Sequence, residues 1–362
     1  MMDSVSPLKL LFLSTSVGPL GSGMGGGVEL TLKNIAQALR DRNHTIAIVA
    51  PAGSILRGFP VIEIPGRLQS TAQSEGRDAW VAMPPESVLA NMWSYARQVQ
   101  ANYDLILNFA YDWLPFYLTP FFQTPIAHLV SMGSLTDATD QIIGQIATDF
   151  PGTIALHSRA QAATFEFGDR CRVVGNGFDL SQYQFCAEPE NALAWVGRLA
   201  PEKGLEDAVI AAQATGIPLK VWGLLQDVAY WQDICDQYPD APVTYEGFLS
   251  TAELQQELGN CRALLMTPRW VEAFGNVAIE ALACGVPVIA YDRGGPAEIV
   301  QHGKTGWLVP PDRVKGLVDA IAKIDQIDRR TCRESAEQDY SLEAMGDRVE
   351  QWFAAILPRK VP

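Results

Sequence analysis

The sequence predicts an α/β protein with two doubly wound, Rossmann-like domains that face a cleft. Its 362 residues are too many for one ordinary core and favour two domains. A βαβ unit opens the chain: an apolar run at Leu8–Ser14 leads through a glycine-rich turn at Gly18–Gly27 to helical spacing over Val28–Arg40. A second apolar run follows at Thr45–Ala50, and a fresh series of this kind starts at Ala192. Such units build parallel sheets covered by helices.

The first domain continues with the same alternation. Leu105–Asn108 and Ile126–Val130 are short apolar runs typical of buried strands, and Val88–Gln100 before them has the spacing of a helix. We expect this domain to span residues 1–172, with the linker to the next domain in the segment 171–190.

The second domain is expected over residues 173–338, and a last helix over 339–362. Gly285 and Pro287 follow the segment Gly275–Cys284, as expected where a helix ends. Ligands of doubly wound sheets bind at the carboxyl ends of the strands. The expected elements of this domain are strands within 192–199, 218–223, 243–248, 263–268 and 286–291, and helices over Leu205–Thr215, Thr251–Gly259 and Gly275–Cys284.

Composition excludes several function classes. The chain has 27 basic and 41 acidic residues, a net charge of −14, which disfavours nucleic acid and anionic membranes as partners. No stretch reaches the roughly 18 apolar residues of a membrane helix, and the run Leu10–Leu13 is too short for a signal-peptide core. The six cysteines form no C-x-x-C pair and no zinc-finger spacing. We therefore expect reduced thiols in a cytoplasmic protein.

The glycine loop before the first helix fits G-x-G-x-x-G from Gly21 to Gly26. A dinucleotide site would also need an acidic residue about 20 positions on, and none occurs between Asp41 and Glu63. Gly25, Gly26 and Gly27 still allow close approach of the backbone to a ligand, and the helix that follows favours an anion. The alternative is a turn without a ligand.

Charged residues of the second half suggest a site for a diphosphate and a sugar. Arg198 follows a predicted strand and Lys203 comes five residues later, so both can converge on a diphosphate. Glu272 precedes the helix Gly275–Cys284, whose N-terminus favours phosphate, and can accept hydrogen bonds from sugar hydroxyls. Glu280, inside that helix, can accept two from a ribose diol.

Several motifs together resemble the family-4 retaining glycosyltransferases of the GT-B fold. They are "GRLAPEKG" (197–204), "EAFGNVAIEALACGVPVIA" (272–290), "GWLV" (306–309), the "GGG" loop and "VVGNGFDLSQY" (173–183). The resemblance spans nearly the whole chain. Glu272 and Glu280, eight positions apart, are a specific sign of this family when Arg198 and Lys203 are also present. The spacing of the two glutamates alone would be weak evidence.

The resemblance implies roles for individual residues. Arg198 and Lys203 would neutralise the diphosphate of a UDP-sugar, most simply UDP-glucose, and Glu272 would bind the sugar hydroxyls. Glu280 would hold the ribose, and His128, taken as lying at a strand end, would lie near the donor sugar. Further donor contacts would come from Gly25, Gly26, Gly27, Ala273, Phe274, Gly275, Asn276 and Val277.

The resemblance also implies a metal-independent hexosyltransferase that retains the anomeric configuration. The chain has no Asp-x-Asp pair to hold a cation, so Arg198, Lys203 and a helix N-terminus would replace the metal, and no cofactor is expected besides the UDP-sugar co-substrate. The amphipathic segment Leu342–Ile356 would return to the first domain. One departure is the turn at Gly223, which lacks the family's usual "GxGP" and leaves the base contacts uncertain.

The acceptor is expected on the first domain, at Tyr111, Asp112, Trp113 and His128. The sequence has no basic amphipathic surface, which favours a small soluble acceptor over a lipid. The chain is similar to glucosyltransferases that modify reduced pterins such as tetrahydrobiopterin, whose flat rings suit aromatic side chains. Two alternatives are an NAD-dependent nucleotide-sugar epimerase or dehydrogenase, which would need the missing acidic residue and a Tyr-x-x-x-Lys pair, and a non-catalytic sugar-nucleotide binding protein.

Overall fold

A computed structural model describes residues 6–22, 24, 26–70 and 76–357. The chain folds into two compact units, one formed by residues 1–177 and 342–362 and the other by residues 178–341. The boundaries differ from the expected ones at 172/173 and 338/339. The first falls inside β7 (Arg172–Val173), a two-residue exposed strand with no apolar pattern to reveal it, and the second falls inside α12 (Arg329–Tyr340).

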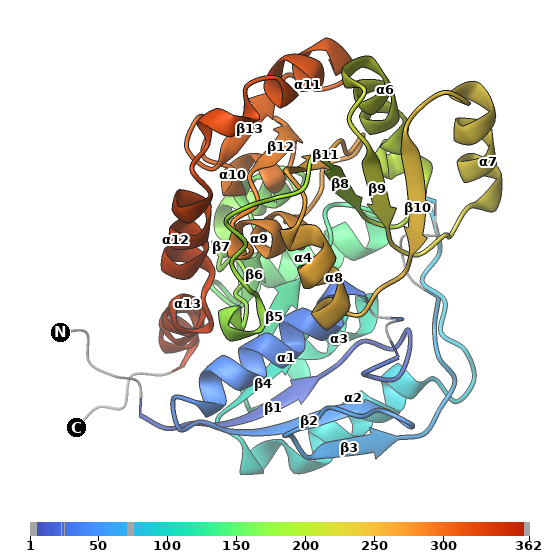
Figure 1. Cartoon of the computed structure of the whole chain (residues 1–362). Helices are drawn as coiled ribbons and strands as arrows, with labels where there is room; N and C mark the ends of the chain where they lie inside the picture. Colours follow the sequence, from blue (N-terminus) through green and yellow to red (C-terminus); the bar gives the residue numbers. More distant parts are fainter. Residues whose placement is uncertain (1–5, 23, 25, 71–75, 358–362) are drawn as a thin grey trace. The chain divides into compact units, whose positions relative to one another are not determined.

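The first unit is built on a seven-stranded parallel sheet (Figure 1). The strand order is β3-β2-β1-β4-β5-β6-β7, so the order reverses between β1 and β4. Ligands of doubly wound sheets bind at such a reversal, beyond the carboxyl ends of the strands. The strands are β1 (Lys9–Leu13), β2 (Thr45–Pro51), β3 (Val61–Ile64), β4 (Leu105–Asn108), β5 (Ile126–Val130), β6 (Ile154–Leu156) and β7.

Helices cover both faces of this sheet because side chains of β1 alternate between them. Leu10 and Phe12 join the core under α1 and α13, whereas Leu11 and Leu13 join the core under α2. The helices are α1 (Gly27–Arg40), α2 (Val88–Val99), α3 (Trp113–Leu118), α4 (Asp137–Asp149), α5 (Arg159–Ala162) and α13 (Leu342–Ile356), with 3-10 turns η2 (Gln100–Asn102), η3 (Thr119–Phe121) and η4 (Gly168–Arg170).

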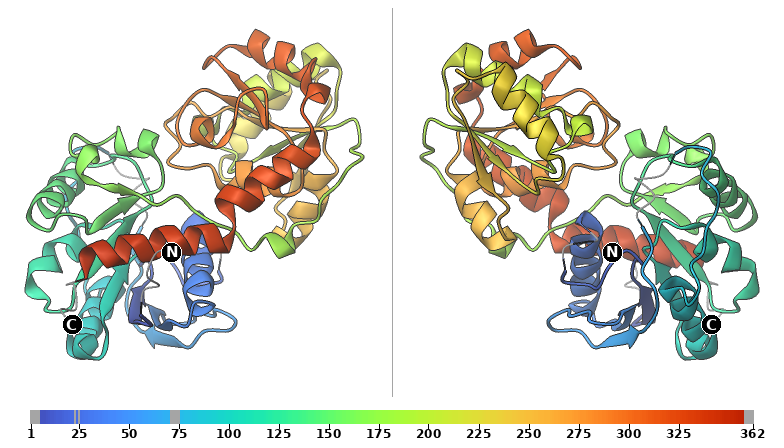
Figure 2. Two further views of the ribbon diagram at one scale, coloured as in Figure 1. Left: turned by 90° about the vertical axis from the view of Figure 1, so that its left-hand side faces the viewer. Right: turned by 90° about the vertical axis from the view of Figure 1, so that its right-hand side faces the viewer.

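Helix α13 covers the residues of the expected amphipathic segment and packs beside α1 (Figure 2). Its apolar face includes Trp352, which is 1 % exposed and donates from Nε1 to the Gly152 carbonyl at 2.8 Å. Its polar side holds Glu350, which contacts the Arg42 guanidinium and the His44 ring, both at 2.9 Å. The last helix of the chain is therefore part of the core of the first unit.

The second unit has a six-stranded parallel sheet in the order β10-β9-β8-β11-β12-β13. Here the order reverses between β8 and β11. Its strands are β8 (Leu193–Val196), β9 (Leu219–Trp222), β10 (Val243–Gly247), β11 (Ala263–Met266), β12 (Val288–Tyr291) and β13 (Gly306–Val309). Its helices are α6 (Leu205–Thr215), α7 (Val228–Gln237), α8 (Thr251–Gly259), α9 (Asn276–Ala283), α10 (Pro296–Ile299), α11 (Val314–Ile321) and α12, with 3-10 turns η5 (Leu180–Gln182), η6 (Pro201–Lys203) and η7 (Ile324–Gln326).

Two arginines of α12 fasten that helix to main-chain carbonyls of the second unit. Arg329 donates to the carbonyls of Cys186, Gly259 and Cys261 at 2.7–3.0 Å. Arg333, one turn later, reaches the segment by which the chain enters this unit. Its contacts are the carbonyls of Leu180, Tyr183 and Ala283, at 2.6–3.3 Å. All six cysteines are free.

The packing of α13 predicts a large effect of shortening Trp352. Trp352→Ala should destabilise the protein by about 3–5 kcal/mol, because it removes a buried ring and leaves a cavity. Trp352→Phe keeps most of the volume and should lose about 1 kcal/mol with the indole hydrogen bond. Urea unfolding followed by circular dichroism would rank the three proteins. Equal midpoints for the alanine and phenylalanine variants would contradict this packing.

Candidate functional site

The expected donor residues of the second unit follow the two strands at which its strand order reverses. Arg198 and Lys203 lie in the connection after β8, and Glu272 lies in the connection after β11. Because parallel strands end at one edge of the sheet, these connections meet there. The predicted donor residues therefore lie at the carboxyl edge of this sheet, in the connections after β8 and β11.

Lys203 and Glu272 form the central contact of the site. The Lys203 ammonium lies 2.5 Å from Glu272 Oε2, and both side chains are about four-fifths buried. Trp270 donates from its indole nitrogen to the same oxygen at 3.2 Å, and Lys203 lies 5.0 Å from the centre of the Trp270 ring. Trp270 was not predicted as a site residue, although it stands two positions before Glu272 in the same connection.

Arg198 is held by two partners at the same edge. Its Nη1 donates to Gln226 Oε1 at 2.5 Å, and its Nη2 contacts Glu202 at 3.0 Å. Gln226 belongs to the turn after Gly223, which lacks the usual "GxGP" sequence of the family it resembles. In this chain the turn supplies the side-chain amide that contacts Arg198. Arg198 is one-third exposed and therefore accessible to an anion.

The connection that carries Glu272 is supported by a glycine turn after β12. Gly294 has φ +69°, and a Cβ there would lie 2.7 Å from Glu272 backbone atoms. A Cβ on Gly295 would lie 2.2 Å from the Phe274 carbonyl oxygen, and the Gly295 amide donates to the Glu272 carbonyl at 2.7 Å. Only glycine permits this approach, which fixes the main chain of Glu272.

Helix α9 begins directly after this connection. Gly275 occupies its N-cap with φ +99° and offers no side-chain cap, and the helix ends at Ala283 with Cys284 as C-cap. The predicted helix Gly275–Cys284 therefore includes both caps. Ala273, Phe274, Asn276 and Val277 lie at or just before the first turn, where a helix favours an anion.

Glu280 is buried in α9 at 8 % exposure. Burial raises the pKa of its carboxyl group from 4.5 to about 7, and a hydrogen bond from Tyr183 opposes this rise. The Tyr183 hydroxyl donates to Glu280 Oε1 at 3.1 Å. Tyr183 lies in the quoted motif "VVGNGFDLSQY" but was given no role, because sequence alone does not show that it reaches α9.

In the first unit, Gly26 is the N-cap of α1 and Gly27 is its first residue, whereas Gly25 lies outside the described residues. A Cβ on Gly26 would meet nothing within 4 Å, so packing does not require a glycine there, although its φ of +54° favours one. Glu29, in the first turn of α1, accepts a hydrogen bond from the Gly21 amide at 2.8 Å. The Glu29 carboxylate therefore puts a negative charge at the helix N-terminus where the sequence predicted an anion to bind.

Tyr111, Asp112 and Trp113 follow β4, as expected. Asp112 is the N-cap of α3: it accepts from the Leu114 amide at 3.2 Å, and its second oxygen accepts from Gln69 at 3.2 Å. Trp113 stacks on Tyr117 with ring centres 4.5 Å apart. The Tyr111 hydroxyl is buried and has no hydrogen-bond partner among the described residues.

The prediction that His128 lies at a strand end is wrong. His128 is the middle residue of β5 and is 0 % exposed. Its ring nitrogens face Asn108 at 3.2 Å and Thr119 at 2.9 Å, its ring stacks on Phe116, and burial lowers its pKa to about 3. An imidazole satisfied on both nitrogens in the core is a packing residue, so this placement does not favour contact with a donor sugar or an acceptor.

A different histidine lies at the carboxyl edge of this sheet. His157 directly follows β6 and donates from Nδ1 to the Gly175 carbonyl at 2.9 Å. This fixes the tautomer, so Nε2 faces Ser131, which follows β5, at 3.4 Å as an acceptor. Burial lowers the pKa of His157. The sequence signal that could have found His157 is its place directly after the short apolar run Ile154–Leu156, whereas His128 lies inside such a run.

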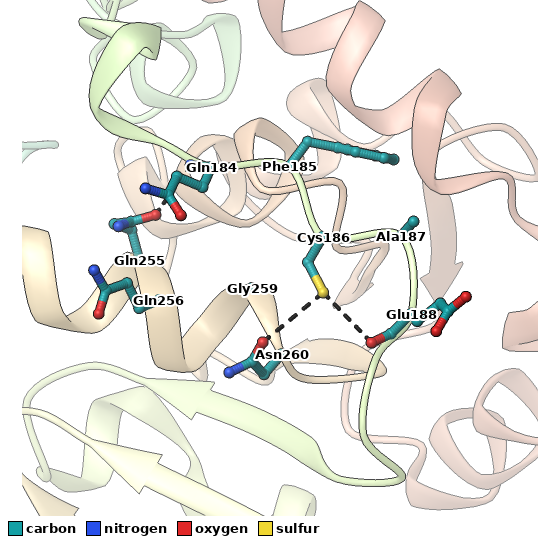
Figure 3. A pocket seen from close by; sticks show the side chains of 9 residues that line it. All are labelled: Gln184, Phe185, Cys186, Ala187, Glu188, Gln255, Gln256, Gly259 and Asn260. Atoms are coloured by element: carbon teal, nitrogen blue, oxygen red, sulfur yellow. Dashed lines mark hydrogen bonds between the residues drawn. The ribbon is translucent and has the colours of Figure 1, made fainter.

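An open hollow of about 540 Å³ in the second unit is lined by none of these donor residues (Figure 3). Cys186 faces Asn260 and the Glu188 carbonyl there. The described residues include no cluster of three metal-ligating side chains. No helix in the described part of the chain has the length and apolar character to cross a membrane.

Residues 181–339 match the family model described as "Glycosyl transferases group 1". Among curated proteins, a D-inositol 3-phosphate glycosyltransferase of Mycobacteroides abscessus is 33 % identical over 200 residues, which are 52 % of this chain and 42 % of that protein. A glycogen synthase of Mycobacterium tuberculosis is 29 % identical over 204 residues, 51 % of this chain and 48 % of that protein. The chain spans less than half the length of these relatives.

Solved structures resemble the whole chain. HepE of Anabaena, crystallised with UDP and glucose, superposes with a TM-score of 0.76 at 20 % identity, covering 96 % of this chain and 100 % of that one. A sucrose-phosphate synthase of Thermosynechococcus elongatus superposes with a TM-score of 0.75 at 19 % identity, covering 96 % and 98 %. The chain therefore has the GT-B fold, and its residues 181–339 are similar to group 1 glycosyltransferases.

The raised pKa of Glu280 predicts how stability depends on pH. Because the folded state holds this proton up to about pH 7 and the unfolded chain only up to about 4.5, the contribution of Glu280 to stability is lost as pH rises through this window. Glu280→Gln removes the titration. Its melting temperature should therefore exceed that of the wild type by a few degrees at pH 8 and match it at pH 5, as measured by calorimetry without ligand. A variant less stable than wild type at pH 8 would speak against a buried, costly carboxylate.

Proposed function

We propose that the protein is a retaining, metal-independent glycosyltransferase that moves a hexose, most simply glucose, from a UDP-sugar to a small soluble acceptor. The observation that carries the proposal is the contact between Lys203 and Glu272 at the reversal point of the second sheet, with Arg198 in the same connection as Lys203 and α9 beginning after the connection that holds Glu272. The match to the group 1 glycosyltransferase model and the fold shared with HepE, which was crystallised with UDP and glucose, support it.

The contact between Lys203 and Glu272 suggests how the donor would bind. A diphosphate would take Lys203 from Glu272, and Glu272 would then accept hydrogen bonds from the sugar hydroxyls. Each charged group would exchange one partner for another, so no charge would be left buried and unpaired. Glu280 would accept hydrogen bonds from the ribose diol, and the Arg198 guanidinium would turn from Glu202 to the phosphates.

The chemical step would depend on the same cations. As the bond between sugar and diphosphate breaks, negative charge grows on the leaving phosphate, and Arg198, Lys203 and the α9 N-terminus stabilise it. We propose front-face displacement, in which the acceptor hydroxyl attacks the side that the phosphate leaves and gives its proton to the departing diphosphate. The sugar then keeps its anomeric configuration.

The acceptor would bind at the carboxyl edge of the first sheet, near Tyr111, Asp112 and Trp113. The stacked rings of Trp113 and Tyr117 support a flat acceptor, and a reduced pterin such as tetrahydrobiopterin is the first compound to test. None of the relatives named above is described as acting on a pterin. Six free thiols support a reducing compartment such as the cytoplasm.

Loss of one donor cation should impair catalysis without unfolding the protein. Lys203→Ala should lower the rate of sugar release from UDP-glucose about a hundredfold, because it removes roughly 3 kcal/mol of leaving-group stabilisation. The matched control is Lys220→Ala, which breaks another lysine–glutamate pair of the same unit, with Glu190. UDP released from UDP-glucose, with and without tetrahydrobiopterin, gives the measurement. Equal rates for wild type and Lys203→Ala would remove the diphosphate assignment.

Chelation should leave the reaction intact, because the proposed site supplies its positive charge through side chains. The rate in excess EDTA should equal the rate in added Mg²⁺ within about twofold, since Arg198 and Lys203 act on the same oxygens that a cation would hold. The same assay provides the readout, and NMR of the product reports the anomeric configuration. Activity that disappears in EDTA and returns with a divalent cation would contradict metal independence, and an inverted product would contradict retention.

A further inference from the structure

Tyr183 joins the segment by which the chain enters the second unit to the carboxylate inside α9. It follows η5 directly and is 5 % exposed. Its carbonyl accepts from Arg333 at 2.8 Å, and its ring packs edge-on to Phe178 with centres 6.2 Å apart. Its hydroxyl donates to Glu280 Oε1 at 3.1 Å. Contacts other than the hydroxyl–carboxylate hydrogen bond therefore hold both the main chain and the ring of Tyr183.

Only one of the two carboxylate oxygens of Glu280 accepts a hydrogen bond from the described residues. Oε1 accepts from Tyr183, whereas Oε2 has no hydrogen bond with any residue in the described part of the chain. A carboxylate can accept at both oxygens, so a buried one with a single protein donor retains capacity for a ligand. The proposed ribose diol would supply two hydroxyl donors, which pair well with an ionised carboxylate.

We propose that Tyr183 is a positioning residue for the nucleotide donor: by binding Glu280 Oε1 it orients the carboxylate and favours its ionised form, so that Oε2 faces a ribose diol. This inference rests on the proposed function, since it assumes that Glu280 contacts the ribose. It deepens that function by predicting selection of ribonucleoside diphosphates over their 2′-deoxy forms.

Two titratable groups from different elements lie near Glu280. The Tyr183 hydroxyl comes from the entering segment and the Cys284 thiol from the C-cap of α9, while Arg333 of α12 binds the Ala283 carbonyl at the end of that helix. Among the described residues, burial and the Tyr183 hydrogen bond are the two influences on the pKa of Glu280, and they act in opposite directions. Burial and the nearby carboxylate raise the pKa of Tyr183 itself, which keeps its hydroxyl protonated and donating.

Removing the hydroxyl should therefore disturb ionisation as well as geometry. In Tyr183→Phe the ring still packs on Phe178, but nothing opposes the effect of burial, and the pKa of Glu280 rises above about 7. A rise of one unit from about 7 lowers the ionised fraction at pH 7 about fivefold, and each further unit lowers it about tenfold. Affinity for a ribonucleotide should then fall at neutral pH and recover as the pH is raised.

The test is calorimetric titration of the full chain with UDP and with 2′-deoxy-UDP between pH 6 and pH 9. The variants are Tyr183→Phe, Glu280→Gln and their double mutant. The matched control is Tyr291→Phe, which removes another buried tyrosine hydroxyl of the same unit, one that donates to Asp207 at 2.7 Å. Ionisation of the phosphates affects every variant alike, so the difference from wild type at each pH is the quantity to compare.

We expect Tyr183→Phe to weaken UDP binding about tenfold at pH 7 and much less at pH 9. The loss should be smaller for 2′-deoxy-UDP, absent in the Glu280→Gln background, and absent in Tyr291→Phe. A loss that is equal at every pH and for both nucleotides would show a packing role only and overturn the inference. So would a full loss in the Glu280→Gln background.

The inference and the proposed function fail in different ways. If wild type binds UDP and Tyr183→Phe binds it equally well at every pH, the inference is wrong and the proposed function stands. If wild type binds neither UDP nor UDP-glucose at any pH, the proposed function is wrong and the inference falls with it.

Discussion

The second unit depends on one constraint, the close approach of two connections beyond the carboxyl ends of β11 and β12. The turn at Gly294 and Gly295 lies against the main chain of Glu272 and Phe274 with no room for a Cβ. This contact fixes where Glu272 stands and where α9 begins. Lys203 and Trp270 then have one position in which to meet the carboxylate, and Glu280 follows at its depth inside α9. Two glycines thus bring together the connections after β11 and β12 at the edge that holds the candidate site.

The site carries balanced charge in a chain of strongly negative net charge. Arg198 and Lys203 each have a glutamate partner, so the edge holds positive charge without repelling its surroundings. Side chains at a few ångströms outweigh the diffuse field of distant carboxylates, which salt screens over about 10 Å. A net charge of −14 is therefore compatible with binding a diphosphate. In the proposed function, specificity for the diphosphate would come from these few residues.

Much of the fold could be predicted because buried parallel strands have continuous apolar sequences, and the segments between them have apolar residues at helical spacing. The Arg198, Lys203, Glu272 and Glu280 positions were predictable from motif spacing, which places them after particular strands. Tyr183 and Trp270 were not, because their contacts join distant segments that no local pattern connects. The error at His128 has another cause. Its place at a strand end came from the family resemblance, although His128 is the middle residue of the apolar run Ile126–Val130, and its burial and partnered ring nitrogens show that it packs inside the sheet.

Three arginines, Arg329, Arg333 and Arg348, hold their surroundings through main-chain carbonyls. A carbonyl is present whatever the side chain, so these contacts do not depend on the identity of the residues they grip. The segments held in this way include 174–176 and 180–186, and the arginine contacts set no requirement on the side chains there. Those side chains have constraints of their own, because Val174, Asn176 and Leu180 are buried. Substitution of any of the three arginines should therefore disturb main-chain positions in a distant segment, whereas the effect of a substitution within a held segment depends on how deeply that side chain is buried.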